Sequence, residues 1–168
     1  MKKITILSAL TLTMSLGVSA NQTKDESWHR DTKDFQTYWT NSYDSNYKAL
    51  MRKIDANEKH SAFIDFRLLI DHKDCQKIDS DYRGETLLEV NHQEIKFIYS
   101  CYENKVLNLE PKNDEGKTYI LEEFQQRSGK SVTFRWPKSN QKDWIFNFSK
   151  TGFKDYYKAV KKSVKKPI

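Results

Sequence analysis

The stretch FIDFRLLID, Phe63–Asp71, decides the fold class that this sequence predicts. Apolar residues occupy every second position from Ile64 to Ile70, and charged residues fill most of the positions between them. This alternation is typical of a β-strand that turns one face to the core and the other to water. Residues 63–71 are therefore expected to form the first strand of a sheet.

Further strand-like runs follow this one along the chain. Asn91-His92 separates two of them, and because asparagine tolerates a positive φ, the pair predicts a β-hairpin. A second hairpin is expected later, where aromatic residues alternate on both sides of a polar turn. The runs cover residues 86–90, 94–102, 106–109, 131–136 and 143–149.

Three helices are expected around the sheet. Over residues 31–56, aromatic and aliphatic side chains recur at spacings of three and four, which predicts an N-terminal helix. Asn113 or Asp114 can cap a central helix that runs to Arg127, and a short closing helix is expected from Phe153. The predicted fold is α+β: an antiparallel sheet of about five strands packed with N-terminal, central and C-terminal helices.

The beginning of the chain has the pattern of a secretory signal peptide. Lys2 and Lys3 form a positively charged start, residues 4–18 carry no charge, and small residues around Ala20 fit a cleavage site. The uncharged run is shorter than the roughly 20 residues that a membrane-spanning helix needs. Cleavage is therefore expected to release a mature chain without a transmembrane segment into the periplasm or the external medium.

These features divide the chain into three parts. Residues 1–20 are the expected signal peptide, residues 21–30 a flexible arm, and residues 31–168 a single α+β domain with a basic C-terminal tail. Loss of Lys2 and Lys3 with the signal lowers the formal net charge from +6 to +4. So modest and mixed a charge does not favour nucleic acid as a partner.

The two cysteines, Cys75 and Cys101, are expected to form one structural disulfide, because an exported chain folds in an oxidising compartment. A redox role usually requires a Cys-x-x-Cys pair, and these residues lie 26 positions apart. Closing a loop of this length constrains the unfolded chain by roughly 3.5 kcal/mol in the entropic account of disulfides.

The sequence contains no recognisable catalytic motif, so we expect a protein that is not an enzyme and uses neither a cofactor nor a metal. The acidic segment 71–81 lacks the ligand spacing of an EF-hand calcium loop. Asp65 and Glu89 could lie on adjacent strands and supply the paired carboxylates that a small cell-wall hydrolase would require, although any charged sheet face offers such pairs.

We therefore expect an exported bacterial envelope protein that acts by binding, in its sharper form an inhibitor or immunity-type protein for a protein partner. Binding of this kind needs a shaped surface rich in Trp, Tyr and Arg rather than a reactive group. The candidate contact residues are Trp28, Trp39, Tyr43 and Trp136.

The C-terminal tail supports an alternative function. Its lysines could bind an anionic envelope polymer or lipid, although a solvated helix terminus explains the same charges. These candidate anion-binding residues are Lys158, Lys161, Lys162, Lys165 and Lys166. A small cell-wall hydrolase is the least favoured function.

Overall fold

The computed structural model describes residues 26–45, 47–73, 75, 82–102, 105–137 and 142–164. The expected signal peptide, residues 21–25 of the expected arm, and Lys165 and Lys166 of the basic tail lie outside the described residues.

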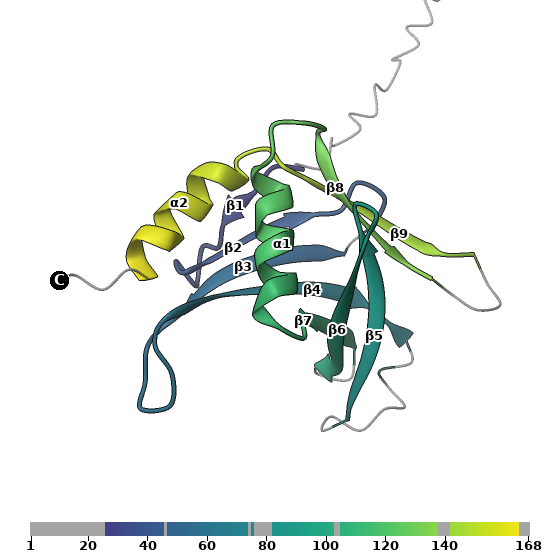
Figure 1. The fold of residues 1–168 in the computed structure, drawn as a ribbon, viewed down its shortest axis with the longest axis horizontal. Helices are drawn as coiled ribbons and strands as arrows, with labels where there is room; N and C mark the ends of the chain where they lie inside the picture. The colour runs from purple at the N-terminus through teal and green to yellow at the C-terminus, as the bar shows by residue number, and fades with distance from the viewer. Residues whose placement is uncertain are drawn as a thin grey trace, which may run out of the picture.

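The described chain forms one antiparallel sheet of nine strands with two helices (Figure 1). The strands are β1 (His29–Arg30), β2 (Thr37–Asn41), β3 (Lys48–Ile54), β4 (Phe63–Asp71), β5 (Arg83–Val90), β6 (Gln93–Tyr102), β7 (Val106–Pro111), β8 (Ser131–Trp136) and β9 (Trp144–Ser149). The helices are α1 (Asp114–Gln125) and α2 (Phe153–Val164). The order across the sheet is β1-β2-β3-β4-β7-β6-β5-β8-β9.

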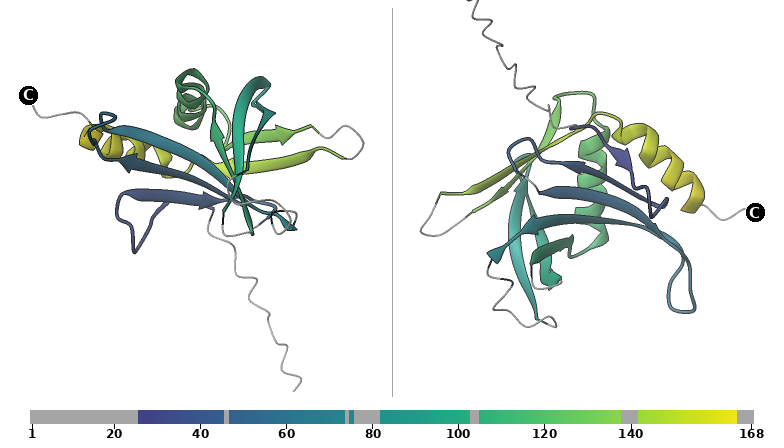
Figure 2. Two further views of the ribbon diagram at one scale, coloured as in Figure 1. Left: turned by 90° about the horizontal axis from the view of Figure 1, so that it is seen from below. Right: turned by 180° about the vertical axis from the view of Figure 1, so that it is seen from behind.

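The sheet is strongly curved, so that it forms a half-barrel (Figure 2). Strands β1 to β4 are neighbours in chain order. Strands β5, β6 and β7 follow in the reverse order, so that β7 pairs with β4. Helix α1 then connects β7 to β8, which pairs with β5. The curvature brings the end of β2 to the last strand, where Ser42 forms a bridge with Phe148. The amide of Tyr43 donates to the carbonyl of Asn147 across the same contact, at 3.0 Å.

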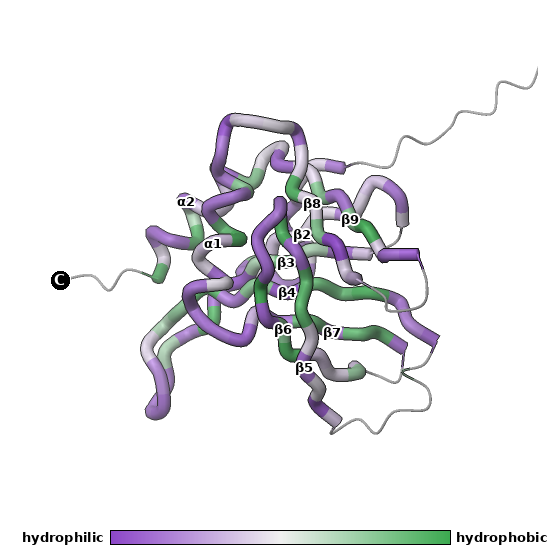
Figure 3. Tube along the Cα trace, turned by 45° about the vertical axis from the view of Figure 1, so that its right-hand side comes forward, coloured by the Kyte–Doolittle hydropathy of each residue, from purple (hydrophilic) through white to green (hydrophobic). Residues whose placement is uncertain are grey.

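The core lies inside this curve, under α1. Phe124 of α1 packs edge-on against Trp28, with ring centroids 5.3 Å apart, and also contacts Phe66 of β4 and Phe134 of β8. Phe153, at the start of α2, stacks on Phe124 at 4.9 Å. The tube in Figure 3 shows hydrophobic positions along the strands and hydrophilic positions along the turns, as expected where strand faces bury apolar side chains.

The fold class predicted from the sequence is wrong. The protein is mainly β, with nine strands instead of about five and two helices instead of three in the described chain. The predicted N-terminal helix over residues 31–56 is absent, because these residues form β2 and β3, which pair from Thr37 opposite Arg52 to Asn41 opposite Lys48. Threonine, tyrosine and tryptophan in this segment suit a strand better than a helix.

The remaining elements lie close to their predicted positions. The turn between β5 and β6 holds Asn91 at φ 45° and His92 at φ 76°, as the hairpin prediction required. Asn113 caps α1, and its side chain accepts a hydrogen bond from the amide of Gly116 at 2.9 Å. The sequence signals for turns and caps therefore located these elements correctly.

Candidate functional site

The most distinctive surface feature is a cluster of aromatic side chains, most of them half-buried, at one end of the curved sheet. Figure 1 shows the end of β4, the beginning of β5, the end of β8 and the beginning of β9 on the side of the fold away from α2. We call this cluster the aromatic end. It consists of Tyr47, His72, Tyr82, Tyr99, Trp136 and Trp144.

Trp144 of β9 lies at the centre of the aromatic end. Its ring packs edge-on against Trp136, directly opposite on β8, at 5.7 Å, and approaches His72 at 5.2 Å. Phe146, two residues further along β9, contacts both Trp144 and Tyr47, with ring centroids 6.4 Å and 5.1 Å apart. Because Phe146 belongs to the buried core, the aromatic end is a partly exposed extension of the core toward solvent.

Tyr99 depends on a glycine for its position. It lies opposite Gly84 in the β5–β6 pair, and a Cβ atom on Gly84 would stand 2.2 Å from Cζ of the tyrosine ring. The ring therefore lies over the bare backbone of β5, between Tyr82 at 6.1 Å and Trp136 at 6.4 Å. A hydrogen bond with Tyr82 and partial burial raise the pKa of Tyr99 above its ordinary value, so the hydroxyl is neutral at physiological pH.

The predicted disulfide is confirmed and supports this end of the sheet. Cys75 is bonded to Cys101, with Cα atoms 5.4 Å apart. Cys101 lies two residues beyond Tyr99 on β6, and the amide of Cys75 donates to the carbonyl of His72 at 3.2 Å. The disulfide thus ties the segment after β4, which carries His72, to the strand that carries Tyr99.

A cavity of about 380 Å³ opens beside β9 at the aromatic end. Tyr47, Trp144 and Phe146 give it an aromatic floor, and charged and polar side chains surround them. The whole lining consists of Asp44, Ser45, Tyr47, Lys142, Asp143, Trp144, Ile145 and Phe146.

The backbone of β9 is open on the side of this cavity. In the described chain β9 pairs with β8 on one side, and the Ser42–Phe148 bridge is its contact with a strand end on the other. The Asn147 carbonyl accepts from Tyr43 and therefore points away from β8. Backbone groups two residues apart point the same way, so the N–H and C=O of Ile145 also face the cavity side. Among the described residues, no strand pairs with β9 at Ile145 on this side.

The four contact residues predicted from the sequence lie in different places. Trp136 belongs to the aromatic end. Trp28 is 2 % exposed, donates from Nε1 to the carbonyl of Ser149 at 2.8 Å, and packs against Phe124 and Phe153 in the core. The last part of the predicted arm is therefore packed into the fold, and Trp28 has no surface to offer a partner.

Trp39 and Tyr43 are half-buried at two further sites. Trp39 lies on the outer face of β2, with the ring of His29 at 5.1 Å and the ammonium of Lys48 at 4.6 Å. The hydroxyl of Tyr43 donates to the carbonyl of Lys130 at 3.4 Å, beside a cavity of about 670 Å³. The structure thus separates the four predicted residues and does not gather them into one surface.

Of the predicted anion-binding residues, Lys158, Lys161 and Lys162 are exposed on α2, and the ammonium of Lys161 lies 5.6 Å from the centre of the Tyr157 ring. Lys165 and Lys166 fall outside the described residues.

The expected adjacency of Asp65 and Glu89 is wrong, because β7 and β6 lie between their strands. Asp65 is held by Arg52 at 2.9 Å and Arg67 at 2.8 Å. Glu89 pairs with Arg135, and the hydrogen bond from the Arg135 guanidinium to the Glu89 carboxylate is the main reason why the pKa of Arg135 is raised. Both carboxylates are therefore occupied in separate ion pairs.

Within the described residues, no group of three or more His, Cys, Asp or Glu side chains could hold a metal ion. Residues 74 and 76–81 of the acidic segment are outside that part of the chain. A search of the described residues found no helix long and apolar enough to cross a membrane. Comparisons of the chain with protein-family models, curated proteins and solved structures found no match.

Sequence reasoning missed Trp144, Tyr99 and Tyr47 as surface residues, although it placed Trp144 correctly in a hairpin. The pairing of Trp136 with Trp144 at the turn end of that hairpin was the available signal, because side chains near a strand end are less deeply covered than those at its middle. Nothing local in the sequence indicated that Tyr47 and His72 would join them, since the paired strands β3 and β4 approach β9 only through the curvature of the sheet.

Proposed function

We propose that this chain is an exported binding protein and that it binds an extended segment of a protein partner at the aromatic end. The observation that carries the proposal is the position of the half-buried aromatic cluster directly beside the open edge of β9. Export is supported by the signal pattern of residues 1–20 and by the disulfide between Cys75 and Cys101.

The composition of the aromatic end supports a protein partner. Tyrosine and tryptophan dominate binding hot spots, because a rigid ring offers a large contact area at a small cost in side-chain entropy. The cavity beside Tyr47 and Trp144 is wide enough to take an apolar side chain of the partner. Asp44 and Lys142 at its border would pair with charges around that side chain, whereas Asp143 is already paired with Arg135 at 3.2 Å.

The open edge of β9 explains why the segment should be extended. A peptide that lies beside a sheet edge gains hydrogen bonds from the exposed backbone, while alternate side chains enter pockets in the sheet surface. Ile145 supplies the exposed N–H and C=O, and the cavity lies on the same side. Binding of this kind blocks a partner without any reactive group, which is how an inhibitor or immunity-type protein acts.

The test compares two substitutions at one position. Ile145→Pro removes the amide hydrogen that faces the cavity but leaves the β8–β9 ladder intact, since proline is tolerated on an edge strand where its N–H would point outward. Ile145→Ala trims the side chain and keeps the amide. Proteins captured from envelope extract by residues 21–168 of each variant are identified by mass spectrometry at physiological salt. A partner retained by Ile145→Ala and lost by Ile145→Pro supports strand addition.

Trp39→Ala serves as a control for the location of the interface, because Trp39 is half-buried like Trp136 and Trp144 of the aromatic end but lies on the outer face of β2. Near-UV circular dichroism establishes that each variant remains folded. If the partner is lost with Trp39→Ala and retained with Ile145→Pro, the interface lies on the outer face of the sheet and the proposal is wrong.

A further inference from the structure

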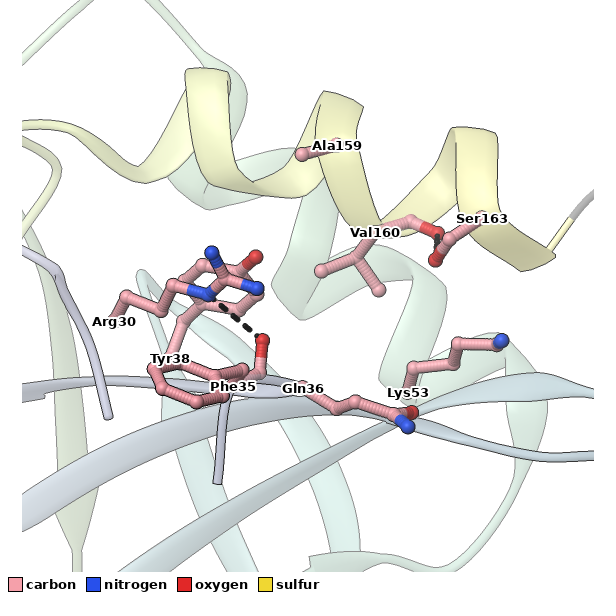
Figure 4. A pocket seen from close by; sticks show the side chains of 8 residues that line it. All are labelled: Arg30, Phe35, Gln36, Tyr38, Lys53, Ala159, Val160 and Ser163. Atoms are coloured by element: carbon pink, nitrogen blue, oxygen red, sulfur yellow. Dashed lines mark hydrogen bonds between the residues drawn. The ribbon is translucent and has the colours of Figure 1, made fainter. Parts of the chain in front are cut away.

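A second surface, remote from the aromatic end, lies between α2 and the strands β2 and β3 (Figure 4). A groove of about 280 Å³ runs under α2, with Ala159 and Val160 above it and Tyr38 in its floor. Phe35 borders it from the turn before β2. Its lining is completed by Arg30, Gln36, Lys53 and Ser163.

Two cations line the groove beside the apolar residues. Arg30 donates from Nε to the carbonyl of Phe35 at 2.8 Å, which fixes the guanidinium over the phenylalanine ring at 5.1 Å. No carboxylate partner of Arg30 is found among the described residues, so its terminal nitrogens can donate to an anion. Lys53 lines the same groove, although Asp55 lies 2.7 Å from its ammonium and offsets part of its charge.

Phe35 is 60 % exposed, the largest exposure of any phenylalanine in the described chain. It stands at the tip of a turn that is held in place by Asp31, whose carboxylate accepts hydrogen bonds from the amides of Lys33 and Asp34 at 2.8 Å. The hydrogen bonds from the amides of Asp34 and Lys33 lower the pKa of Asp31, so the carboxylate that accepts them is ionised at physiological pH. An apolar ring presented on a rigid turn is unfavourable in water and favourable where it can enter an apolar layer.

Helix α2 borders the same groove with Ala159, Val160 and Ser163 and carries basic charge on its solvent-exposed face. Its apolar face, including Phe153 and Val160, is buried against the core, and its outer face carries exposed lysines. Asp155 is the acidic residue of α2. The exposed lysines of the helix are Lys154, Lys158, Lys161 and Lys162.

We propose that α2 and the Phe35 turn together form a docking surface for an anionic phospholipid membrane. The lysines of α2 and Arg30 contact lipid phosphates, and the Phe35 ring enters the interfacial layer beside them. Basic side chains near an anionic lipid surface and an exposed ring among them are the two features that give peripheral proteins their membrane affinity. A dissolved polyanion would use the lysines but would gain nothing from Phe35, and this difference separates the two kinds of ligand.

The experiment is flotation of residues 21–168 with vesicles of phosphatidylglycerol mixed with phosphatidylcholine, and with vesicles of phosphatidylcholine alone. The protein is expected to float with the anionic vesicles and to remain unbound with the neutral ones. The double variant Lys158→Gln/Lys162→Gln should weaken binding about twenty-five-fold, since each basic residue near the surface contributes about fivefold. Lys96→Gln/Lys130→Gln removes the same charge from exposed positions elsewhere and should have a much smaller effect.

Phe35→Ser should weaken binding by about tenfold or more. Leu87→Ser is its control, because Leu87 is 44 % exposed on β5, far from α2 in the order of the sheet. If Phe35→Ser binds anionic vesicles as tightly as the unchanged protein, or if both lysine pairs weaken binding equally, the protein binds polyanions through its charge alone and the docking surface does not exist. Absence of binding to anionic vesicles at low salt would equally overturn the proposal.

Discussion

Substituting Gly84 with alanine should displace the ring of Tyr99, which lies over the backbone of Gly84 at the aromatic end. The new Cβ would lie 2.2, 2.4 and 2.6 Å from Cζ, Oη and Cε1 of Tyr99, whereas ordinary contacts of a Cβ atom lie at 3.4 Å or more. The ring must therefore move by more than an ångström, and Tyr82 and Trp136 on its two sides restrict where it can go. Overpacking of this kind costs roughly 1 to 3 kcal/mol.

The cost can be assigned to Tyr99 by a double-mutant cycle. Free energies of unfolding are measured by urea denaturation for Gly84→Ala, Tyr99→Ala and the double variant, with thermal denaturation as a second readout. Gly84→Ala should be destabilising in the presence of Tyr99 and close to neutral in the Tyr99→Ala background, with a coupling energy of about 1 kcal/mol or more. An equal cost in both backgrounds would show that the glycine is needed for its backbone conformation, and the reasoning from ring packing would be refuted.

Three further predictions concern the core and the aromatic end. Replacing Cys75 and Cys101 by alanine should lower the free energy of unfolding by roughly 3.5 kcal/mol, as measured by urea denaturation against the unchanged protein. Trp28→Ala should cost about 3 to 5 kcal/mol, because it empties a site in the core, and a thermal midpoint unchanged from wild type would contradict its burial. Tyr82→Phe removes the hydrogen bond that raises the pKa of Tyr99, so that pKa should fall toward its ordinary value of 10.0, as followed by NMR of the tyrosine ring carbons. The raised pKa disfavours the tyrosinate in the folded state. The stability that the Tyr99 hydroxyl contributes is therefore present below pH 10 and is lost as the pH rises through the folded pKa of Tyr99. Tyr82→Phe should make this loss of stability smaller.

The strands and helices after residue 63 could be predicted from the sequence because their signals are local. Alternation gave β4, a positive-φ pair gave the β5–β6 hairpin, and the Asn113 cap gave α1. The prediction for the segment before β4 was wrong because residues four apart lie on one face of a helix and also on one face of a strand, where side chains repeat every two residues. Phe35, Trp39 and Met51 follow this spacing, yet Trp39 lies on the outer face, Met51 in the core, and Phe35 in a turn.

The site could be predicted only in part, for a related reason. Aromatic content indicated a binding surface, but whether a tryptophan is exposed depends on long-range packing that no local pattern reveals. Trp28 precedes the first long strand in a polar segment, and it is buried because α1 and α2 both close over it. Trp144 alternates with buried Phe146, and it remains half-exposed because the turn after β2 leads the chain away from β9.

The most direct test of the proposed function is amide hydrogen exchange of residues 21–168, followed by NMR with and without the captured partner. The account predicts that binding slows exchange of the Ile145 amide, which faces the cavity, while the amides around Trp39 on β2 exchange as before. Slower exchange around Trp39 with no change at Ile145 would contradict it and would place the partner on the outer face of the sheet.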